Sequence, residues 1–237
     1  MIGWLKHERR SIRVRDRAGF SWLLAHLDKR CEQAYAGLAH EVPREFGDID
    51  GRLRAALELM KNSRPETASQ PRFAGITAEL IRQYSADLVE HLAGIQSVED
   101  SEAIHAVRIR GKRLRYLLEP LASETRPAAA MIGLMKQFQD RFGALCDAFV
   151  QARELVQAVE LAGADQARRR LARVLRLKHA GSVPRHVLPG LLVLAARLQV
   201  ETRRRYAAVT CDYLDGRIVG LIDPIETVAR SLLRRVA

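Results

Sequence analysis

The apolar residues of this chain recur mainly at the three- and four-residue spacing of an α-helix, and no stretch of useful length alternates as a strand would. This spacing predicts eight helical stretches, over residues 18–38, 52–61, 73–91, 101–119, 128–160, 165–178, 191–214 and 225–236. Proline, glycine and polar residues predict loops at 42–51, 62–71 and 181–190. We therefore expect an all-α protein, built as one or more bundles of about eight helices.

The polar segment 62–71 is the best candidate boundary in the first half of the chain. It divides an N-terminal basic segment with its helices, residues 1–70, from a longer helical region, residues 71–237. Pro120 is expected to end or kink the helix that begins near Ser101, because proline lacks an amide proton and disfavours helix at the residue before it.

The amino-acid composition limits the chemical class of the binding partner. The chain has 237 residues, is 48% apolar and carries a formal net charge of +11, which predicts a folded protein with a polyanionic partner. Nucleic acid, polyphosphate and an anionic membrane surface are all compatible with that charge. Only 5% of the residues are aromatic, which argues against a single-strand binder that stacks bases.

The cysteines, the N-terminus and the most apolar run indicate the cellular compartment in which the protein resides. The three cysteines are far apart and form no Cys-x-x-Cys pair, so neither a zinc site nor a disulfide scaffold is predicted. The N-terminus is too charged for a secretory signal. The most apolar run, residues 187–200, is short for a membrane span and contains Pro189 and Arg197. We expect a cytoplasmic protein with no membrane span.

A row of cations stands out between His105 and Tyr116, a segment that contains no acid. On a helix, four basic side chains fall within an arc of about 80°, opposite the apolar residues. They are His105, Arg108, Lys112 and Arg115. Like charges on consecutive turns repel by a few tenths of a kcal/mol per pair. The row therefore predicts a bound anion, although a solvated helix face is the alternative.

The spacing in this segment resembles the signature of the CHAD family, the conserved-histidine α-helical domain. The matching residues are His105, Arg108, Ile109, Lys112, Arg113, Leu114, Arg115 and Tyr116, followed by Glu119. A second conserved block of the family is matched further along the chain. The residues that resemble it are Phe138-Gln139-Asp140, Phe142-Gly143 and Asp147. The signature region thus spans 105–119 and 138–147. The resemblance implies a CHAD-like helical domain with a basic groove or channel that binds inorganic polyphosphate.

Further cations are candidates for the same groove. Arg169, Arg173 and Arg176 share one face of the helix predicted at 165–178. The sequence from Arg13 to Arg17 resembles the sequence from Arg108 to Lys112. Because CHAD proteins usually carry two related halves, the earlier segment is a candidate for the basic helix of the first half. The predicted polyphosphate-binding set therefore adds Arg113 and Tyr116 to the row, together with Arg13, Arg17, Arg169, Arg173 and Arg176. Only one full signature is visible, so either the first half is shortened or a second chain completes the groove in a homodimer.

Two acids are candidates for holding these cations in place. Asp140 and Asp147 lie on one face of the helix predicted at 128–160, within about 80° by helical projection. As charge-assisted partners of the basic side chains they would contribute roughly 1.5–3 kcal/mol each when partly buried. The alternative is that both acids are solvated.

The sequence contains no catalytic motif: no Gly-x-Ser-x-Gly, P-loop, His-Glu-x-x-His or dinucleotide fingerprint. His105 is the one histidine in a suggestive setting, as a hydrogen-bond donor to phosphate, a metal ligand or a phosphoacceptor. We favour the donor role and predict no catalytic residue, metal or cofactor. Two rivals remain, a nonspecific binder of nucleic-acid backbones and a metal-dependent phosphate-handling enzyme that uses His105.

Low aromatic content and helix-borne arginines favour inorganic polyphosphate over single-stranded nucleic acid as the ligand. Polyphosphate is a flexible chain with about one charge per unit and no bases to stack. The guanidinium fork of arginine matches pairs of phosphate oxygens. A double-stranded nucleic acid is harder to exclude, because contacts to its phosphates alone can hold it.

Overall fold

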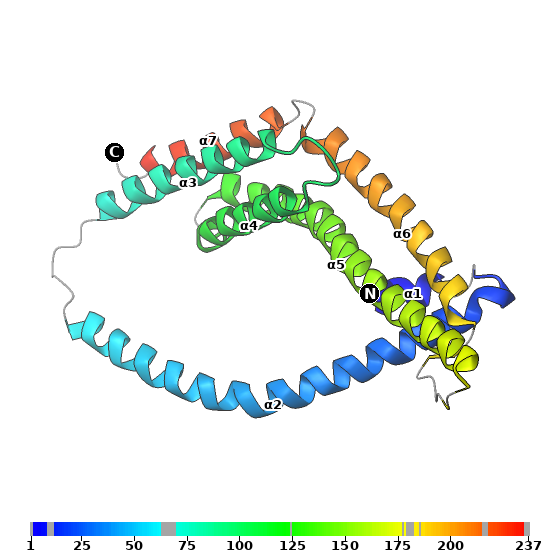
Figure 1. Ribbon diagram of the computed structural model, residues 1–237. Helices are drawn as coiled ribbons and strands as arrows, with labels where there is room; N and C mark the ends of the chain where they lie inside the picture. The colour runs from blue at the N-terminus through cyan, green and yellow to red at the C-terminus, as the bar shows by residue number, and fades with distance from the viewer. Residues whose placement is uncertain are drawn as a thin grey trace. The chain divides into compact units, whose positions relative to one another are not determined.

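The computed structural model describes residues 2–8, 12–62, 70–123, 125–176, 178, 183–184, 186–214 and 218–234. Within these ranges the chain forms seven α-helices and no strand (Figure 1), which confirms the all-α prediction. The helices are α1 (Ile2–Glu8), α2 (Arg17–Asn62), α3 (Gln70–Ala93), α4 (Ser101–Leu118), α5 (Arg126–Val174), α6 (Val187–Val209) and α7 (Val219–Arg234). Short helical turns follow at Val14–Asp16, Glu119–Leu121 and Thr210–Leu214.

Two pairs of helices expected from the sequence are each one continuous helix. Residues 18–38 and 52–61 belong to the 46-residue α2, so the loop predicted at 42–51 is wrong. Pro43 lies inside α2, where its ring already has a helical φ, and the carbonyl it leaves without a partner lies on an exposed stretch where water can bond it. Residues 128–160 and 165–178 likewise fall largely in the 49-residue α5. Most of the linker predicted at 62–71 lies outside the described residues.

The chain divides into two compact units. Unit 1 comprises Met1–Ala68 and Arg153–Ala196, and unit 2 comprises Ser69–Ala152 and Arg197–Ala237. Residues 153–196 therefore group with the N-terminal segment, whereas the sequence placed them with the residues after 71. Helices α5 and α6 each contribute to both units.

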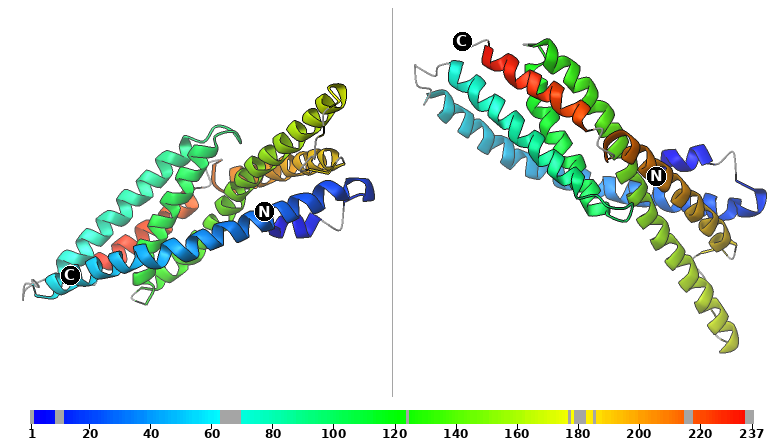
Figure 2. Two further views of the ribbon diagram at one scale, coloured as in Figure 1. Left: turned by 60° about the horizontal axis from the view of Figure 1, so that its bottom comes forward. Right: turned by 90° about the horizontal axis from the view of Figure 1, so that it is seen from above.

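Unit 2 has a core formed by α3, α4, the first half of α5 and α7. Helix α3 packs against both α4 and α7, as Figures 1 and 2 show. The apolar stripe predicted for α5 is buried, with Met131, Met135 and Leu145 fully enclosed. The rings of Phe138 and Phe142 stack at 4.4 Å between centroids. Burial of such side chains contributes roughly 1.5–3 kcal/mol each and fixes α4 against a rigid support.

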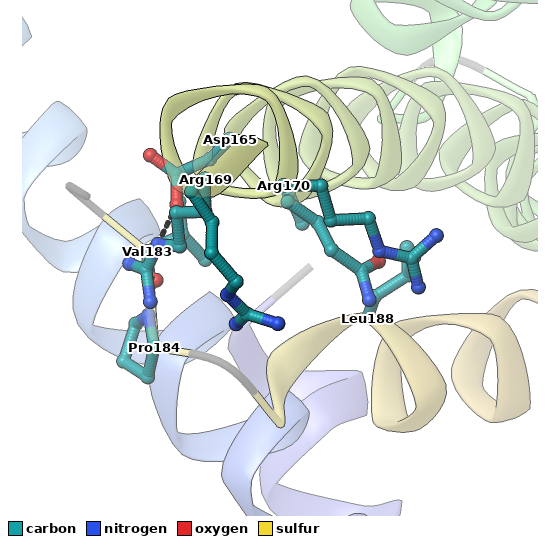
Figure 3. A pocket seen from close by; sticks show the side chains of 9 residues that line it. Asp165, Arg169, Arg170, Val183, Pro184 and Leu188 are labelled. Atoms are coloured by element: carbon teal, nitrogen blue, oxygen red, sulfur yellow. Dashed lines mark hydrogen bonds and ion pairs between the residues drawn. The ribbon is translucent and has the colours of Figure 1, made fainter. Parts of the chain in front are cut away.

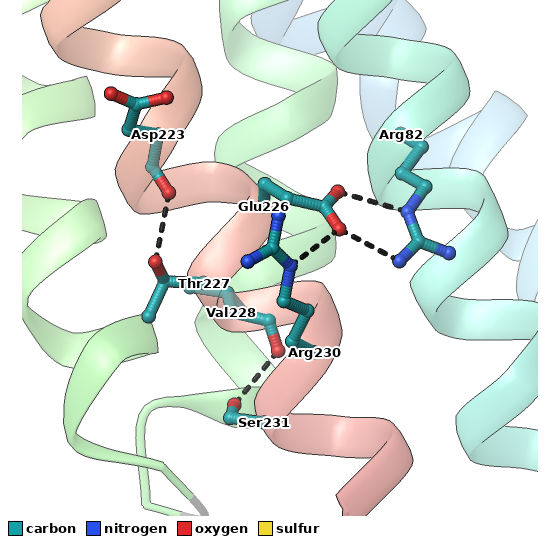
Figure 4. Close-up of polar contacts among 7 residues, drawn as sticks. All are labelled: Arg82, Asp223, Glu226, Thr227, Val228, Arg230 and Ser231. Atoms are coloured by element: carbon teal, nitrogen blue, oxygen red, sulfur yellow. Dashed lines mark hydrogen bonds and ion pairs between the residues drawn. The ribbon is translucent and has the colours of Figure 1, made fainter.

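A three-residue ion network joins α3 to α7 at the surface of unit 2 (Figure 4). Arg82 on α3 donates two hydrogen bonds to the carboxylate of Glu226 on α7, each 2.9 Å long. Arg230 donates a third, at 3.1 Å, from one turn further along α7. These bonds, that from Arg82 above all, lower the pKa of Glu226 to about 2.

Unit 1 contains a close approach of backbones between α2 and α6. Gly19 and Gly190 are both buried, and a Cβ on Gly19 would stand 2.5 Å from the carbonyl oxygen of Val187 and 2.7 Å from the Cα of Gly190. Only glycine permits two helices to approach this closely. Leu5, Leu23 and Leu27 fill the core beside this crossing.

No helix in the described parts of the chain combines the length and the apolar character that crossing a membrane requires. Cys146 is buried in unit 2, while Cys31 and Cys211 are exposed.

Candidate functional site

Helix α4 carries the row of cations and begins where the sequence predicts. Asp100 precedes the first residue, Ser101, and its carboxylate accepts hydrogen bonds of 2.8 Å from the amides of Gln96 and Ser97. These two bonds lower the pKa of Asp100. The helix ends at Leu118, immediately before the turn that contains Pro120, so that prediction is also confirmed.

One face of α4 is buried at regular helical spacing, which fixes the direction of the opposite face. The buried residues are Ile104, Val107, Gly111, Leu114 and Leu118. Gly111 faces α5 directly, where a Cβ would stand 2.5 Å from Cε1 of Phe138. The side chain of Gln139 donates a 3.2 Å hydrogen bond to the carbonyl of Gly111.

The second glycine of the signature region also meets α4. The Nε atom of Arg108 lies 3.7 Å from the point where a Cβ of Gly143 would stand. The side chain of Arg108 therefore crosses α5 where no side chain blocks it. Cys146 lies close to it: burial raises the pKa of this thiol, and the charge of Arg108 opposes that rise.

The cations of α4 fall into two groups. In the first group an acid holds the guanidinium: Arg110 pairs with Asp87 of α3 at 3.0 Å, and Arg115 lies 3.5 Å from Glu119. Arg115 also lies over the ring of Tyr116, 5.0 Å from its centroid, and its Nε is buried without a hydrogen-bond partner. These residues brace the helix as well as adding charge.

The second group has no acid partner. Within the described residues, His105, Arg108, Lys112 and Arg113 make no ion pair and no side-chain hydrogen bond. His105 and Arg113 are exposed, whereas Arg108 and Lys112 are half-buried. A half-buried stem lowers the freedom of a long side chain and leaves its charged end in solvent. This arrangement suits an external anion.

The acids predicted to orient these cations lie elsewhere on α5. Asp140 and Asp147 are exposed, and in the described part of the chain neither pairs with a cation of α4. Asp140 lines a pocket of about 740 Å³ with Arg141, Asp212 and Tyr213. Burial raises the pKa of Tyr213, and Asp212 adds to the rise. The orienting role of both acids stays a prediction.

Sequence reasoning missed Asp87 as a partner of α4. It occupies α3, one turn before His91, and holds both His91 Nδ1, at 3.2 Å, and Arg110. Nothing in the periodicity of α3 distinguishes Asp87 from a solvated acid, because the contact depends on how α3 and α4 lie together.

The remaining predicted cations belong to unit 1. Arg13 and Arg17 flank the short turn Val14–Asp16, and both are exposed. Asp16 between them is buried, with its carboxylate 3.9 Å from Arg15. That these residues line one groove with the row on α4 stays a prediction.

The second half of α5 places its arginines around a small pocket of about 250 Å³ (Figure 3). Arg169, Arg170 and Arg173 line it, opposite Pro184 and Leu188. Arg169 is held there, since its Nε lies 2.8 Å from Asp165 and its terminal nitrogen donates to the carbonyl of Val183.

Arg173 and Arg176 extend from the end of the same helix and are exposed. Arg176 adopts a positive φ of 54°, just beyond the last residue of α5. Arg169 is thus held in this pocket, while Arg173 and Arg176 present their charge to solvent; that the three bind polyphosphate stays a prediction.

Among the residues that the structure describes, no group of three or more histidine, cysteine or acidic side chains comes together in a way that could hold a metal ion.

Comparison with known proteins identifies the family. No curated protein and no solved structure matches the chain. The family model described as CHAD domain matches residues 1–157, which include α4 and the first half of α5. The match covers well over half of the 237 residues. The chain therefore belongs to the CHAD-domain family.

Proposed function

We propose that this protein binds inorganic polyphosphate, and that the contact is made by the row of cations on α4 without any catalytic step. The observation that carries the proposal is the division among those cations. Arg110 and Arg115 have acids beside them, whereas His105, Arg108, Lys112 and Arg113 have none in the described chain. Membership of the CHAD family supports the ligand class, because CHAD domains in general bind polyphosphate.

The geometry supports a polymer better than a single phosphate. His105, Arg108 and Lys112 are spaced by three and four residues, so their Cβ atoms lie on successive turns about 5–6 Å apart. A linear polyanion can satisfy several of them together. Each charge-assisted bond to a phosphate oxygen contributes about 1.5–3 kcal/mol. His105 would donate one hydrogen bond, and Arg108 would offer two parallel donors.

The first experiment compares ligands. We would titrate long-chain polyphosphate and a DNA or RNA duplex of matched charge at two salt concentrations. Binding that depends on phosphate contacts weakens steeply with salt for both. We expect clearly tighter binding of polyphosphate at both concentrations. Equal affinity would support the rival function, nonspecific binding of nucleic-acid backbones.

The second experiment tests the row itself. Lys112→Ala and Arg108→Ala should each weaken polyphosphate binding by about tenfold, which corresponds to the loss of one charge-assisted contact. Arg230→Ala is the matched control, because it removes one positive charge from α7 and leaves the Arg82–Glu226 pair in place. Equal loss in all three variants would mean that only total charge matters and would remove α4 from the site.

A thermal shift gives an independent reading. Polyphosphate at about 100 times its dissociation constant should add roughly 2.7 kcal/mol to the free energy of unfolding.

For the enzyme alternative, the assay is phosphate release with and without divalent metal. Release that requires metal and disappears in His105→Ala would replace binding by catalysis as the function.

A further inference from the structure

Helix α2 carries an uncovered apolar face. Beyond Leu27, large apolar side chains continue along one side of the helix with 47–72% of their surface exposed. We call this set the α2 stripe; it consists of Tyr35, Leu38, Val42, Phe46, Ile49, Leu53, Leu57 and Met60. By helical projection the set falls within an arc of about 100°. A contiguous apolar surface of this kind marks an interaction site far more often than a solvated face.

The spacing of the α2 stripe is regular and symmetric. Its members follow one another by 3, 4, 4, 3, 4, 4 and 3 residues. The unit of 3, 4 and 4 is an 11-residue repeat, whose period lies so close to that of an α-helix that the stripe runs nearly straight. The series also reads the same from both ends. A helix with this pattern is complementary to an antiparallel copy of itself.

A two-fold axis between Gly47 and Asp48 aligns the two stripes completely. It places each member of the stripe opposite a different member in the second copy: Tyr35 opposite Met60, Leu38 opposite Leu57, Val42 opposite Leu53 and Phe46 opposite Ile49. The stripe covers 26 residues, roughly 39 Å of helix. That length equals between three and four heptads, which is the range in which two helices pair stably in water.

The charges beside the α2 stripe agree with the antiparallel orientation. One edge carries Glu41, Glu45 and Arg52. None of these three makes an ion pair within the described chain, unlike Arg54, which pairs with Asp50. In the antiparallel pair, Arg52 of one copy lies level with the point between Glu41 and Glu45 of the other. A parallel pair would instead set Glu45 beside Asp50 of its neighbour, acid against acid.

We propose that α2 is a self-association surface, through which two copies of this chain pair antiparallel along the α2 stripe. The proposal does not depend on the bound anion, since it involves neither α4 nor the arginines of α5. The competing occupant of the stripe is another part of the same chain, which would leave the protein monomeric.

Sedimentation velocity of the full chain under reducing conditions, from about 1 to 100 μM, tests the proposal; this is the concentration range in which micromolar pairing is visible. We expect a dimer. Phe46→Glu places a carboxylate at the centre of both stripes and should give a monomer with unchanged helix content by circular dichroism. Ala55→Glu introduces the same charge on the opposite side of α2 and should remain dimeric. A wild-type chain that stays monomeric throughout would overturn the proposal.

A charge exchange tests the orientation. Arg52→Glu should weaken the dimer by about tenfold or more, because it sets a third acid level with Glu41 and Glu45 of the other copy. The double variant Glu41→Lys, Glu45→Lys should weaken it by a similar factor. A 1:1 mixture of the two variants restores every opposite-charge contact and should dimerise like the wild type.

Arg44→Glu matches the charge change of Arg52→Glu on the far side of α2 and should have no effect. If the mixture stays monomeric while each variant remains folded, the antiparallel arrangement is wrong.

Discussion

The ring of Phe138 lies against the backbone of Gly111, so close that a Cβ on residue 111 would stand 2.5 Å from Cε1 of the ring. The contact sets how near α4 comes to α5, and therefore where the row of cations stands. The carbonyl of the same glycine accepts the hydrogen bond from Gln139. Gly111 is thus a packing residue inside the signature, although it carries no functional group.

Gly111→Ala should destabilise unit 2 by about 1–3 kcal/mol, because the added methyl group overpacks a core that contains Phe138. Urea denaturation followed by circular dichroism measures the change. Gly133→Ala in α5 is the control. It has no atom within 4 Å of a new Cβ and should gain about 0.5–1 kcal/mol from the higher helix propensity of alanine. A neutral Gly111→Ala would mean that the two helices can separate without cost.

Substitutions at Arg110 and Lys112 should have opposite effects, one on the free energy of unfolding and the other on polyphosphate affinity. Arg110→Ala removes the pair with Asp87 and should cost about 0.5–1 kcal/mol of unfolding free energy, typical of a part-exposed pair. It should change polyphosphate affinity by less than about twofold, because its guanidinium is directed at α3.

Lys112→Ala should do the reverse and leave stability unchanged. A double-mutant cycle with Asp87→Ala measures the coupling of the Arg110 pair directly. An Arg110→Ala variant that binds tenfold more weakly would place Arg110 in the site.

Glu226 should make stability depend on pH in a defined window. Its folded pKa of about 2 lies below the ordinary value of 4.5, so the carboxylate stabilises the fold above pH 4.5 and this contribution is lost as the pH falls toward 2. The network is open to solvent, so Glu226→Gln should cost only about 1 kcal/mol at pH 6.

Urea titrations at pH 6, 4 and 3 would test this, with the exposed Glu90→Gln on α3 as the control. The difference between wild type and Glu226→Gln should shrink with each step toward acid. A constant difference at all three pH values would show that the ion network contributes nothing.

Cys146 should be the slow thiol of the protein. Burial raises its pKa and excludes reagents, while Cys31 and Cys211 are exposed. A colorimetric thiol reagent at pH 8 should therefore titrate two groups quickly, and the third at least about 100-fold more slowly, through opening of unit 2. Cys146→Ala should abolish only the slow phase. Three fast thiols would mean that the α4–α5 contact opens readily.

Local signals in the sequence predicted most of the helical stretches and the two ends of α4, but not that one helix continues through a proline. Ser101 and Pro120 mark the ends of α4 correctly, because the turn that the Asp100 carboxylate closes before Ser101 and the missing proline amide both act within a few residues. The same reasoning fails at Pro43, which lies within α2. Helix-forming residues on both sides of Pro43, and water at an exposed surface, compensate for one lost hydrogen bond.

Some features of the candidate site could be predicted from helical spacing, and others could not. Helical spacing places His105, Arg108 and Lys112 on one face, opposite the buried residues, and this agrees with the structure. Spacing does not indicate which cations have acids beside them. The pairing of Arg110 with Asp87 depends on the register between α3 and α4, and only coordinates supply that register.

Helix α5 passes without interruption from unit 2 into unit 1, and within α6 the chain passes back from unit 1 to unit 2. Neither unit is therefore a continuous stretch of sequence that a single cut would release. A fragment ending near Ala152 would lose the portions of α6 and α7 that complete unit 2, and a fragment starting at Arg153 would lack α2. Gene truncations that aim to isolate unit 2, which contains α4, should instead join Ala152 to Arg197 through a designed linker.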